Sequence, residues 1–206
     1  MDEDVIAAMR RWPGIAPVYG WMRLDARGRW RILRRDRADF DPVRDAQGET
    51  IGSPALNDYI ARNYAADTDG AWFWQNGPQR VYLALETAPL IYRVLERRDG
   101  QPGKALVAHT GYRAEEIAGA WIDPDGRVYL RTELGPGMVH DQDLVHLALP
   151  ELADSAPEAW CTDAHSTLGS LHWTDLQGSV VAVPLRLAHD AAQVLGFVRN
   201  PRPPQD

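Results

Sequence analysis

Residues 72–85 read Trp-Phe-Trp-Gln-Asn-Gly-Pro-Gln-Arg-Val-Tyr-Leu-Ala-Leu, which predicts two antiparallel strands joined by a turn. Asn-Gly is a strong hairpin signal because both residues tolerate a positive φ. After the turn, Val81, Leu83 and Leu85 alternate with polar and aromatic residues, so an aliphatic row should face the core. Pro78 cannot donate a ladder hydrogen bond, and it therefore predicts a connection longer than two residues.

Aromatic residues of the same hairpin are candidates for a binding surface. Trp72 and Trp74 share one face of the first strand. If Arg80 and Tyr82 lie opposite them, the rings and the guanidinium form a ladder in which each good pair contributes roughly 0.5–1 kcal/mol. Two interpretations stay open: the eight tryptophans of the chain fill the core, or some of them form a surface for a sugar or aromatic ligand.

The rest of the chain repeats these signals and predicts an α+β fold, made mainly of antiparallel β-hairpins with two or three short packed helices. A first helix is expected at about 3–12, and a second begins at Ser53-Pro54. Further hairpins are expected over residues 19–33, 90–108, 120–132 and 171–187. Residues 112–117 suggest a helical turn, Gly135-Pro136-Gly137 a break in the chain, and Pro184 an edge strand.

Residues 1–200 are predicted to form a single compact domain, followed by a disordered tail at 201–206. Within that domain the pattern Trp-x-Asp-x-x-Gly-x-Val occurs at 121–128 and 173–180, and Asp-x-x-Gly-x-Trp occurs at 25–30 and 67–72. One explanation is an internal duplication with a boundary near 109–116. The other is reuse of one turn chemistry, which the irregular spacing of the copies favours.

Composition excludes several classes of protein. The formal net charge of −7 argues against nucleic acid as a partner. Cys161 is the only cysteine, which suits a reducing compartment. No apolar run approaches the roughly 18–20 residues of a membrane helix, and the acidic first residues do not resemble a signal peptide. We therefore expect a soluble cytoplasmic protein with no membrane partner.

The sequence gives only weak indications of a catalytic or metal-binding site. The sequence contains no phosphate-binding glycine loop, Cys-x-x-Cys, His-Glu-x-x-His or Gly-x-Ser-x-Gly motif, and no cofactor is expected. Imidazoles and carboxylates at His140, Asp141, Asp143 and His146 could ligate a metal in a metal-assisted hydrolase. The alternative is a polar loop without a metal, because the two histidines lack helical i,i+4 spacing.

The leading functional hypothesis is a binding or interaction domain whose partner is an unknown small molecule or protein. Its surface would combine the hairpin with the second helix and with a strand end. A structural homodimer that buries tryptophans is a third alternative. The candidate ligand-binding residues are Asn63, Trp72, Trp74, Asn76, Arg80, Tyr82 and His109.

Several strings in the first 110 residues resemble a family of uncharacterised proteobacterial proteins. They are residues 19–21 (Tyr-Gly-Trp), 25–31 (Asp-Ala-Arg-Gly-Arg-Trp-Arg), 62–64 (Arg-Asn-Tyr) and 75–82 (Gln-Asn-Gly-Pro-Gln-Arg-Val-Tyr). The resemblance implies a bacterial cytosolic protein. It implies no activity and no catalytic residues.

Overall fold

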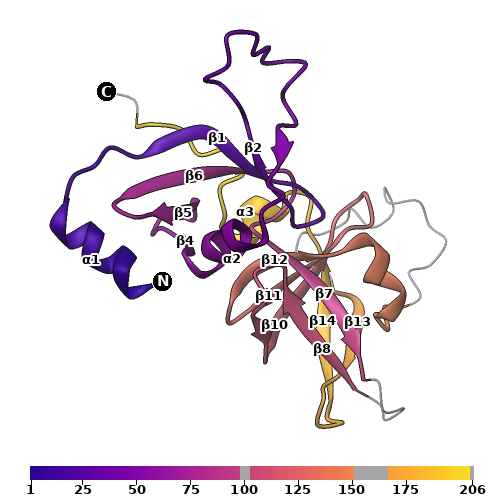
Figure 1. Ribbon diagram of the computed structural model, residues 1–206. Helices are drawn as coiled ribbons and strands as arrows, with labels where there is room; N and C mark the ends of the chain where they lie inside the picture. Colours follow the sequence, from indigo (N-terminus) through magenta and orange to yellow (C-terminus); the bar gives the residue numbers. More distant parts are fainter. Residues whose placement is uncertain (98–102, 151–166, 205–206) are drawn as a thin grey trace. The chain divides into compact units, whose positions relative to one another are not determined.

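The computed structural model describes residues 1–97, 103–150 and 167–204, and Cys161 lies outside them (Figure 1). The fold class is α+β, as predicted. The chain divides into two compact units, Met1–Pro89 with Gly196–Asp206 and Leu90–Leu195. The division falls at residue 89, away from the boundary near 109–116 that a duplication suggests. The single compact domain and the disordered tail stay predictions.

The first unit is built on a six-stranded sheet with the order β3-β2-β1-β6-β5-β4. Its helices are α1 (Glu3–Arg11) and α2 (Pro54–Arg62), which confirms both predicted helices. Its strands are β1 (Val18–Leu24), β2 (Trp30–Ile32), β3 (Glu49–Thr50), β4 (Tyr64–Ala66), β5 (Trp72–Asn76) and β6 (Gln79–Leu85). Strands β1 and β6 pair in parallel, so segments far apart in sequence meet at the centre of the sheet.

The central hairpin is tighter than the sequence predicts. Asn76 pairs with Gln79, so only Gly77 and Pro78 form the connection. Gly77 has a φ of +56°, and the proline ring holds the next φ negative, which is the sign combination of a type II′ turn. The expectation of a longer loop was therefore wrong, because proline is acceptable at the second turn position, where no ladder N–H is needed.

This register places the two tryptophans on the opposite face from Arg80 and Tyr82. Phe73 pairs with Tyr82 and Gln75 with Arg80, whereas Trp74 pairs with Val81. The aromatic and guanidinium ladder that we expected is therefore made by Phe73, and not by the tryptophans, with Arg80 and Tyr82. Side chains alternate along a strand, so a shift of one residue exchanges the two faces.

The tryptophan face forms the core of the first unit beneath α2. The rings of Trp74 and Tyr59 meet edge to face with centroids 5.9 Å apart, and those of Trp72 and Tyr64 lie 4.8 Å apart. Met22, Leu24, Trp30, Ile60, Val81, Leu83 and Leu85 are buried as well. This arrangement supports the core interpretation for Trp72, and it places the half-buried Trp74 at the edge of the same core against Tyr59.

The other face of the sheet is covered in part by the end of the chain. Val198 packs against a buried cluster of Ala71, Phe73 and Tyr82, and its N–H donates to the carbonyl of Gly70 over 2.9 Å. The Leu85 N–H likewise donates to the carbonyl of Arg199 over 2.7 Å. The part of this face that lies toward the hairpin turn is where the candidate site is found.

The second unit is an eight-stranded sheet with the order β13-β14-β10-β11-β12-β7-β8-β9. Its strands are β7 (Leu90–Glu96), β8 (Lys104–Ala108), β9 (Arg113–Ala114), β10 (Ile117–Ile122), β11 (Val128–Thr132), β12 (Gly135–Val139), β13 (Thr167–Thr174) and β14 (Val180–Leu187). A 3₁₀ helix η1 (Asp141–His146) and the helix α3 (Ala191–Leu195) complete it. The predicted hairpins over 90–108, 120–132 and 171–187 are confirmed.

Three local predictions in this unit were wrong. Residues 112–117 contain strand β9 instead of a helical turn. Residues 135–137 begin strand β12, because Gly137 allows close packing: a Cβ there would lie 2.4 Å from a ring carbon of Tyr92. Strand β14 lies between β13 and β10, so Pro184 is tolerated inside the sheet.

Four turns share one hydrogen-bonding pattern, and they account for the sequence echoes. They span residues 25–29, 67–71, 123–127 and 175–179. In each, one carboxylate oxygen of the first aspartate accepts backbone N–H bonds from the residues two and four positions later. The glycine at the fourth position takes a positive φ, as at Gly126 (+79°). This local chemistry explains the echoes without a duplication.

We expect Asp123→Ala to lower the free energy of unfolding by about 2–3 kcal/mol, because the buried carboxylate also accepts from the Tyr129 hydroxyl over 3.0 Å. Asp175→Ala is the matched control: it removes the same two backbone bonds at an exposed turn, with an expected loss of about 1 kcal/mol. Urea unfolding followed by circular dichroism measures both. Equal losses would contradict a role for the second carboxylate oxygen.

Candidate functional site

A cavity of the first unit lies beside the hairpin turn, between the end of α1 with the segment that follows it and strands β5 and β6. Its volume is about 300 Å³. We call it the hairpin groove. Its lining residues are Met9, Trp12, Pro13, Gly14, Ile15, Pro17, Gln75, Pro78, Arg80 and Tyr82.

One wall is the end of α1, which is held in place at its other end. Asn63 closes the C-terminus of α2 and is buried. Its Oδ1 accepts from the Asp2 backbone N–H over 2.8 Å, and its Nδ2 donates to the Asp2 carboxylate over 3.1 Å and to the Tyr59 carbonyl over 2.9 Å. Arg62 adds an ion pair to Asp2 at 3.1 Å. Asn63 thus anchors α1 and does not line the groove.

The segment between α1 and β1 continues this wall. Gln79, which flanks the hairpin turn, donates from its Nε2 to the carbonyl of Ala16 over 3.3 Å. Trp12 and Ile15 remain 49% and 45% exposed. Two large apolar side chains therefore face water beside the hairpin although the chain around them is held by hydrogen bonds.

The hairpin supplies the polar wall. The Arg80 guanidinium lies over the Phe73 ring, 4.5 Å from its centroid. Opposite Arg80, Gln75 is 1% exposed, and its Nε2 donates to the Gly77 carbonyl over 2.9 Å. Its Oε1 is buried and accepts no hydrogen bond from the described residues. Leaving a buried acceptor unpaired costs about 1–3 kcal/mol.

Tyr82 forms the floor between the two walls. Its ring stacks on Tyr19 with centroids 4.6 Å apart and planes 5° from parallel. Its hydroxyl donates to the Asp67 carboxylate over 2.9 Å. Burial raises the pKa of Tyr82, and the bond to Asp67 raises it further against the opposing effect of Arg80. The phenol therefore stays neutral near pH 7 and serves as a rigid surface.

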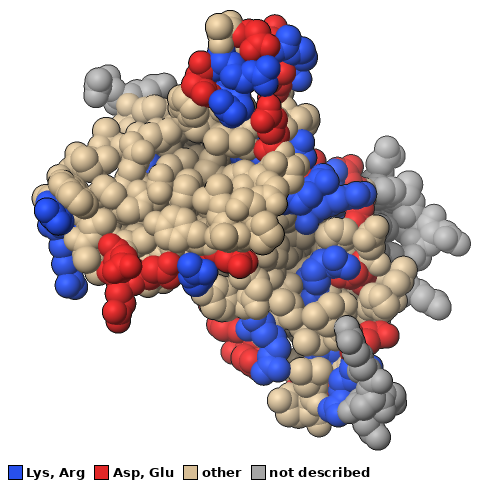
Figure 2. All heavy atoms as spheres, in the orientation of Figure 1, with Lys and Arg blue, Asp and Glu red and all other residues tan. Residues whose placement is uncertain are grey.

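The lining of the groove carries little charge. Arg80 is the only charged side chain among the lining residues, and they include no carboxylate. Arg11 lies just outside, with its guanidinium 4.8 Å from the centre of the Trp12 ring. Figure 2 shows few charged atoms between α1 and β6, and the basic residues of α1, Arg10 and Arg11, lie in its last turn. The groove thus combines an apolar body with positive charge at its edge.

The predicted binding residues lie in three different places: in or beside the groove, on the other face of the sheet, and in the second unit. Arg80 and Tyr82 line the groove, and Asn76 is exposed at the adjoining turn. Trp72 is buried in the core on the other face and Trp74 is half-buried beside it, where its buried indole N–H has no acceptor among the described residues. His109 belongs to the second unit, where its Nδ1 accepts from the Ile91 N–H over 3.2 Å.

The residues that sequence reasoning missed are Gln75 and the end of the first helix. Met9 and Trp12 fall on its apolar stripe, which indicates burial. The signal that could have identified them is Pro13, which ends the helix directly after Trp12 and leaves that ring at a helix end.

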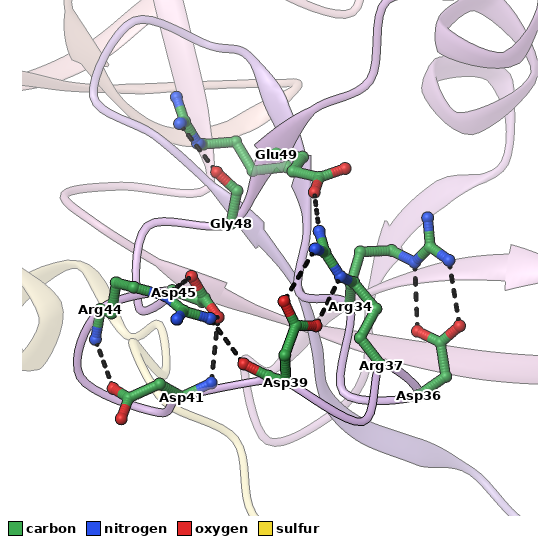
Figure 3. Close-up of polar contacts among 10 residues, drawn as sticks. Arg34, Asp36, Arg37, Asp39, Asp41, Arg44, Asp45, Gly48 and Glu49 are labelled. Atoms are coloured by element: carbon green, nitrogen blue, oxygen red, sulfur yellow. Dashed lines mark hydrogen bonds and ion pairs between the residues drawn. The ribbon is translucent and has the colours of Figure 1, made fainter.

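A second, smaller cavity of about 140 Å³ lies in the charged loop between β2 and β3. The loop projects from the sheet and carries basic and acidic side chains in close alternation (Figures 1 and 2). Figure 3 shows three arginines of the loop in ion pairs: Arg34 with Asp36, Arg37 with Asp39 and Glu49, and Arg44 with Asp45. Because these pairs neutralise one another, the loop is a weaker candidate for anion binding than the groove.

The candidate metal ligands in the second unit are engaged by other groups of the protein. Asp143 is 4% exposed and accepts from Arg93 Nε over 2.6 Å and from the Val94 N–H over 2.9 Å. His146 contacts Glu96 at 3.2 Å, and the buried His140 contacts Asp141 at 2.8 Å. No cluster of three or more His, Cys, Asp or Glu side chains suited to a metal occurs among the described residues. Asp143 therefore joins η1 to β7.

The chain belongs to the DUF2944 family, described as "Protein of unknown function (DUF2946)", whose family model matches residues 1–202. This confirms the resemblance to an uncharacterised family. No curated protein matches the chain significantly. No helix among the described residues has the length and apolar character needed to cross a membrane.

Two solved structures are similar to the chain. A DUF1285 family protein from Shewanella baltica OS155 is 18% identical, covers 61% of this chain and 88% of its own, and has a TM-score of 0.42. A DUF1285 family protein from Silicibacter pomeroyi DSS-3 is 15% identical, covers 89% of this chain and 96% of its own, and has a TM-score of 0.47. Both TM-scores are below 0.5, so neither structure supports a conclusion about the site.

We expect Asn63→Ala to loosen α1, because it removes three hydrogen bonds that hold Asp2 and the end of α2. The expected loss of protection is about 1–3 kcal/mol, measured by hydrogen exchange of the α1 amides. Asn57→Ala is the control, since Asn57 donates from the same helix to the Ile51 carbonyl. Unchanged exchange in α1 would contradict the anchoring role.

The stability of the second unit should decrease in acid through Asp143. Burial alone raises its pKa, but the hydrogen bonds from Arg93 and Val94 outweigh burial and hold the pKa below 3.8. The stabilisation is therefore complete above about pH 4 and is lost as the pH falls through the folded-state pKa. Urea unfolding between about pH 6 and about pH 3 should show a smaller decrease for Asp143→Asn than for the unmodified protein. Identical decreases would contradict this assignment.

Proposed function

We propose that the first unit is a binding module for a small, largely apolar molecule, which it holds in the hairpin groove. The observation that carries the proposal is the pair Trp12 and Ile15, half exposed on the wall of a 300 Å³ cavity. Cavities of about 300–1,000 Å³ that combine apolar walls with a few polar groups are typical of small-molecule sites. Removing the two side chains from water would supply the driving force.

The lining supports binding more than catalysis. It contains no histidine, cysteine, serine or carboxylate, which are the usual nucleophiles and general bases. Its one titratable phenol, Tyr82, already donates to Asp67. Since the metal-ligating alternative also lacks a cluster among the described residues, the enzyme hypothesis gains no support. The cytoplasmic location and the homodimer stay predictions from the sequence.

Ile15→Asp tests the groove because it places a charge on the apolar wall. A suitable probe is 3-phenylpropionamide, which is neutral and carries one aromatic ring. We expect its binding, followed by two-dimensional NMR of the labelled protein, to shift amide signals of residues 9–17 and 75–82. Ile15→Asp should weaken the affinity at least about tenfold, equivalent to about 1.4 kcal/mol.

Val43→Asp is the matched control, since Val43 is exposed in the charged loop outside the groove. It should bind the probe as the unmodified protein does. Absence of binding to the unmodified protein, or equal weakening by the two substitutions, would contradict the proposed site.

A further inference from the structure

We propose that the ligand of the hairpin groove is an apolar monocarboxylate, and that Arg80 binds its carboxylate. The inference rests on the proposed function and specifies the chemical class of the ligand. It rests on three observations: Arg80 is exposed and has no carboxylate partner, the lining carries no other charge, and the uncharged Gln75 lies opposite Arg80.

Arg80 is available for an incoming anion. Its side chain is exposed and forms no ion pair with a carboxylate of the described residues; its guanidinium contacts the Phe73 ring and the Tyr82 hydroxyl. Asp67, which accepts from the neighbouring Tyr82 hydroxyl, is also engaged by the N–H groups of Asp69 and Ala71. In contrast, Arg34 and Arg37 of the charged loop each have carboxylate partners.

The guanidinium is also held in a suitable orientation. Its central carbon lies 4.5 Å from the centre of the Phe73 ring, so the guanidinium is held against a fixed aromatic surface. A planar guanidinium binds a carboxylate with two parallel N–H···O bonds, and a fixed plane reduces the entropy lost on binding. Phe73 is itself buried against Tyr82, so the supporting ring is part of the core.

The lining limits the ligand to one negative charge. Arg80 is its only charged residue, so a single carboxylate is neutralised. Gln75, on the opposite strand, is uncharged and cannot neutralise a second anion. The remaining walls, formed by Met9, Trp12 and Ile15, suit an aromatic or aliphatic body.

The size of the cavity favours a free small molecule over the end of a polypeptide. Its volume of about 300 Å³ lies at the lower limit of small-molecule sites, and so it accommodates a single ring or short chain with its carboxylate.

Calorimetric titration with three probes of the same skeleton tests the inference: 3-phenylpropionate, its neutral amide 3-phenylpropionamide, and the cation 3-phenylpropylamine. The unmodified protein should bind the acid at least about tenfold more tightly than the amide, and the amine least of all. Raising the salt concentration should reduce the difference between acid and amide.

Arg80→Gln should abolish the preference for the acid over the amide, which is measured as the ratio of the two affinities in the same variant. Arg80→Lys keeps the charge without the planar fork and should retain part of the preference. Arg34→Gln, in the charged loop, is the control and should retain all of it. Comparison of acid and amide on the unmodified protein does not depend on the folding of any variant.

Equal affinity for the acid and the amide would overturn the carboxylate assignment and leave the groove as a binding site. A preference for the acid that persists in Arg80→Gln would overturn the role of Arg80. Failure of all three probes to bind would overturn the proposed function together with this inference.

Discussion

The two-residue turn at Gly77 and Pro78 is the constraint on which the first unit depends. It pairs Asn76 with Gln79 and thereby sets the register of the whole hairpin. With this register, Trp72 and Trp74 enter the core beneath α2, and Gln75, Arg80 and Tyr82 form the opposite face. One additional residue in the turn would exchange these sets, burying a guanidinium and exposing two indoles. A single local backbone conformation therefore separates the core from the candidate site.

Most of the secondary structure could be predicted because its causes are local. Alternation of apolar residues, proline after the first helix and the Asp-x-x-Gly turns each act within a few residues of their own position. The turns are the clearest case, since one carboxylate oxygen binds two nearby N–H groups in all four. The error at Gly137 arose from a tertiary contact, because its place in a strand depends on the ring of Tyr92, whereas the length of the turn at Pro78 was a misjudged local preference.

The candidate site was less predictable because it joins segments that are distant in sequence. Arg80 and Tyr82 were identified from the pattern of the hairpin, but their partners on the other wall come from residues 9–17. The position of that wall depends on Asn63, whose bonds to Asp2 span 61 residues. Asp143 shows the reverse problem: its residue type suggests a metal ligand, whereas its environment makes it the partner of Arg93.

Anchoring α1 through Asp2 has a thermodynamic consequence for the groove. The wall formed by Met9 and Trp12 exists only while α1 is docked, so docking of the helix and occupancy of the cavity are linked equilibria. A ligand that contacts this wall must stabilise the docked helix by the same free energy by which docking improves its affinity. Asn63, which touches no ligand, would then tune affinity from the far end of a nine-residue helix.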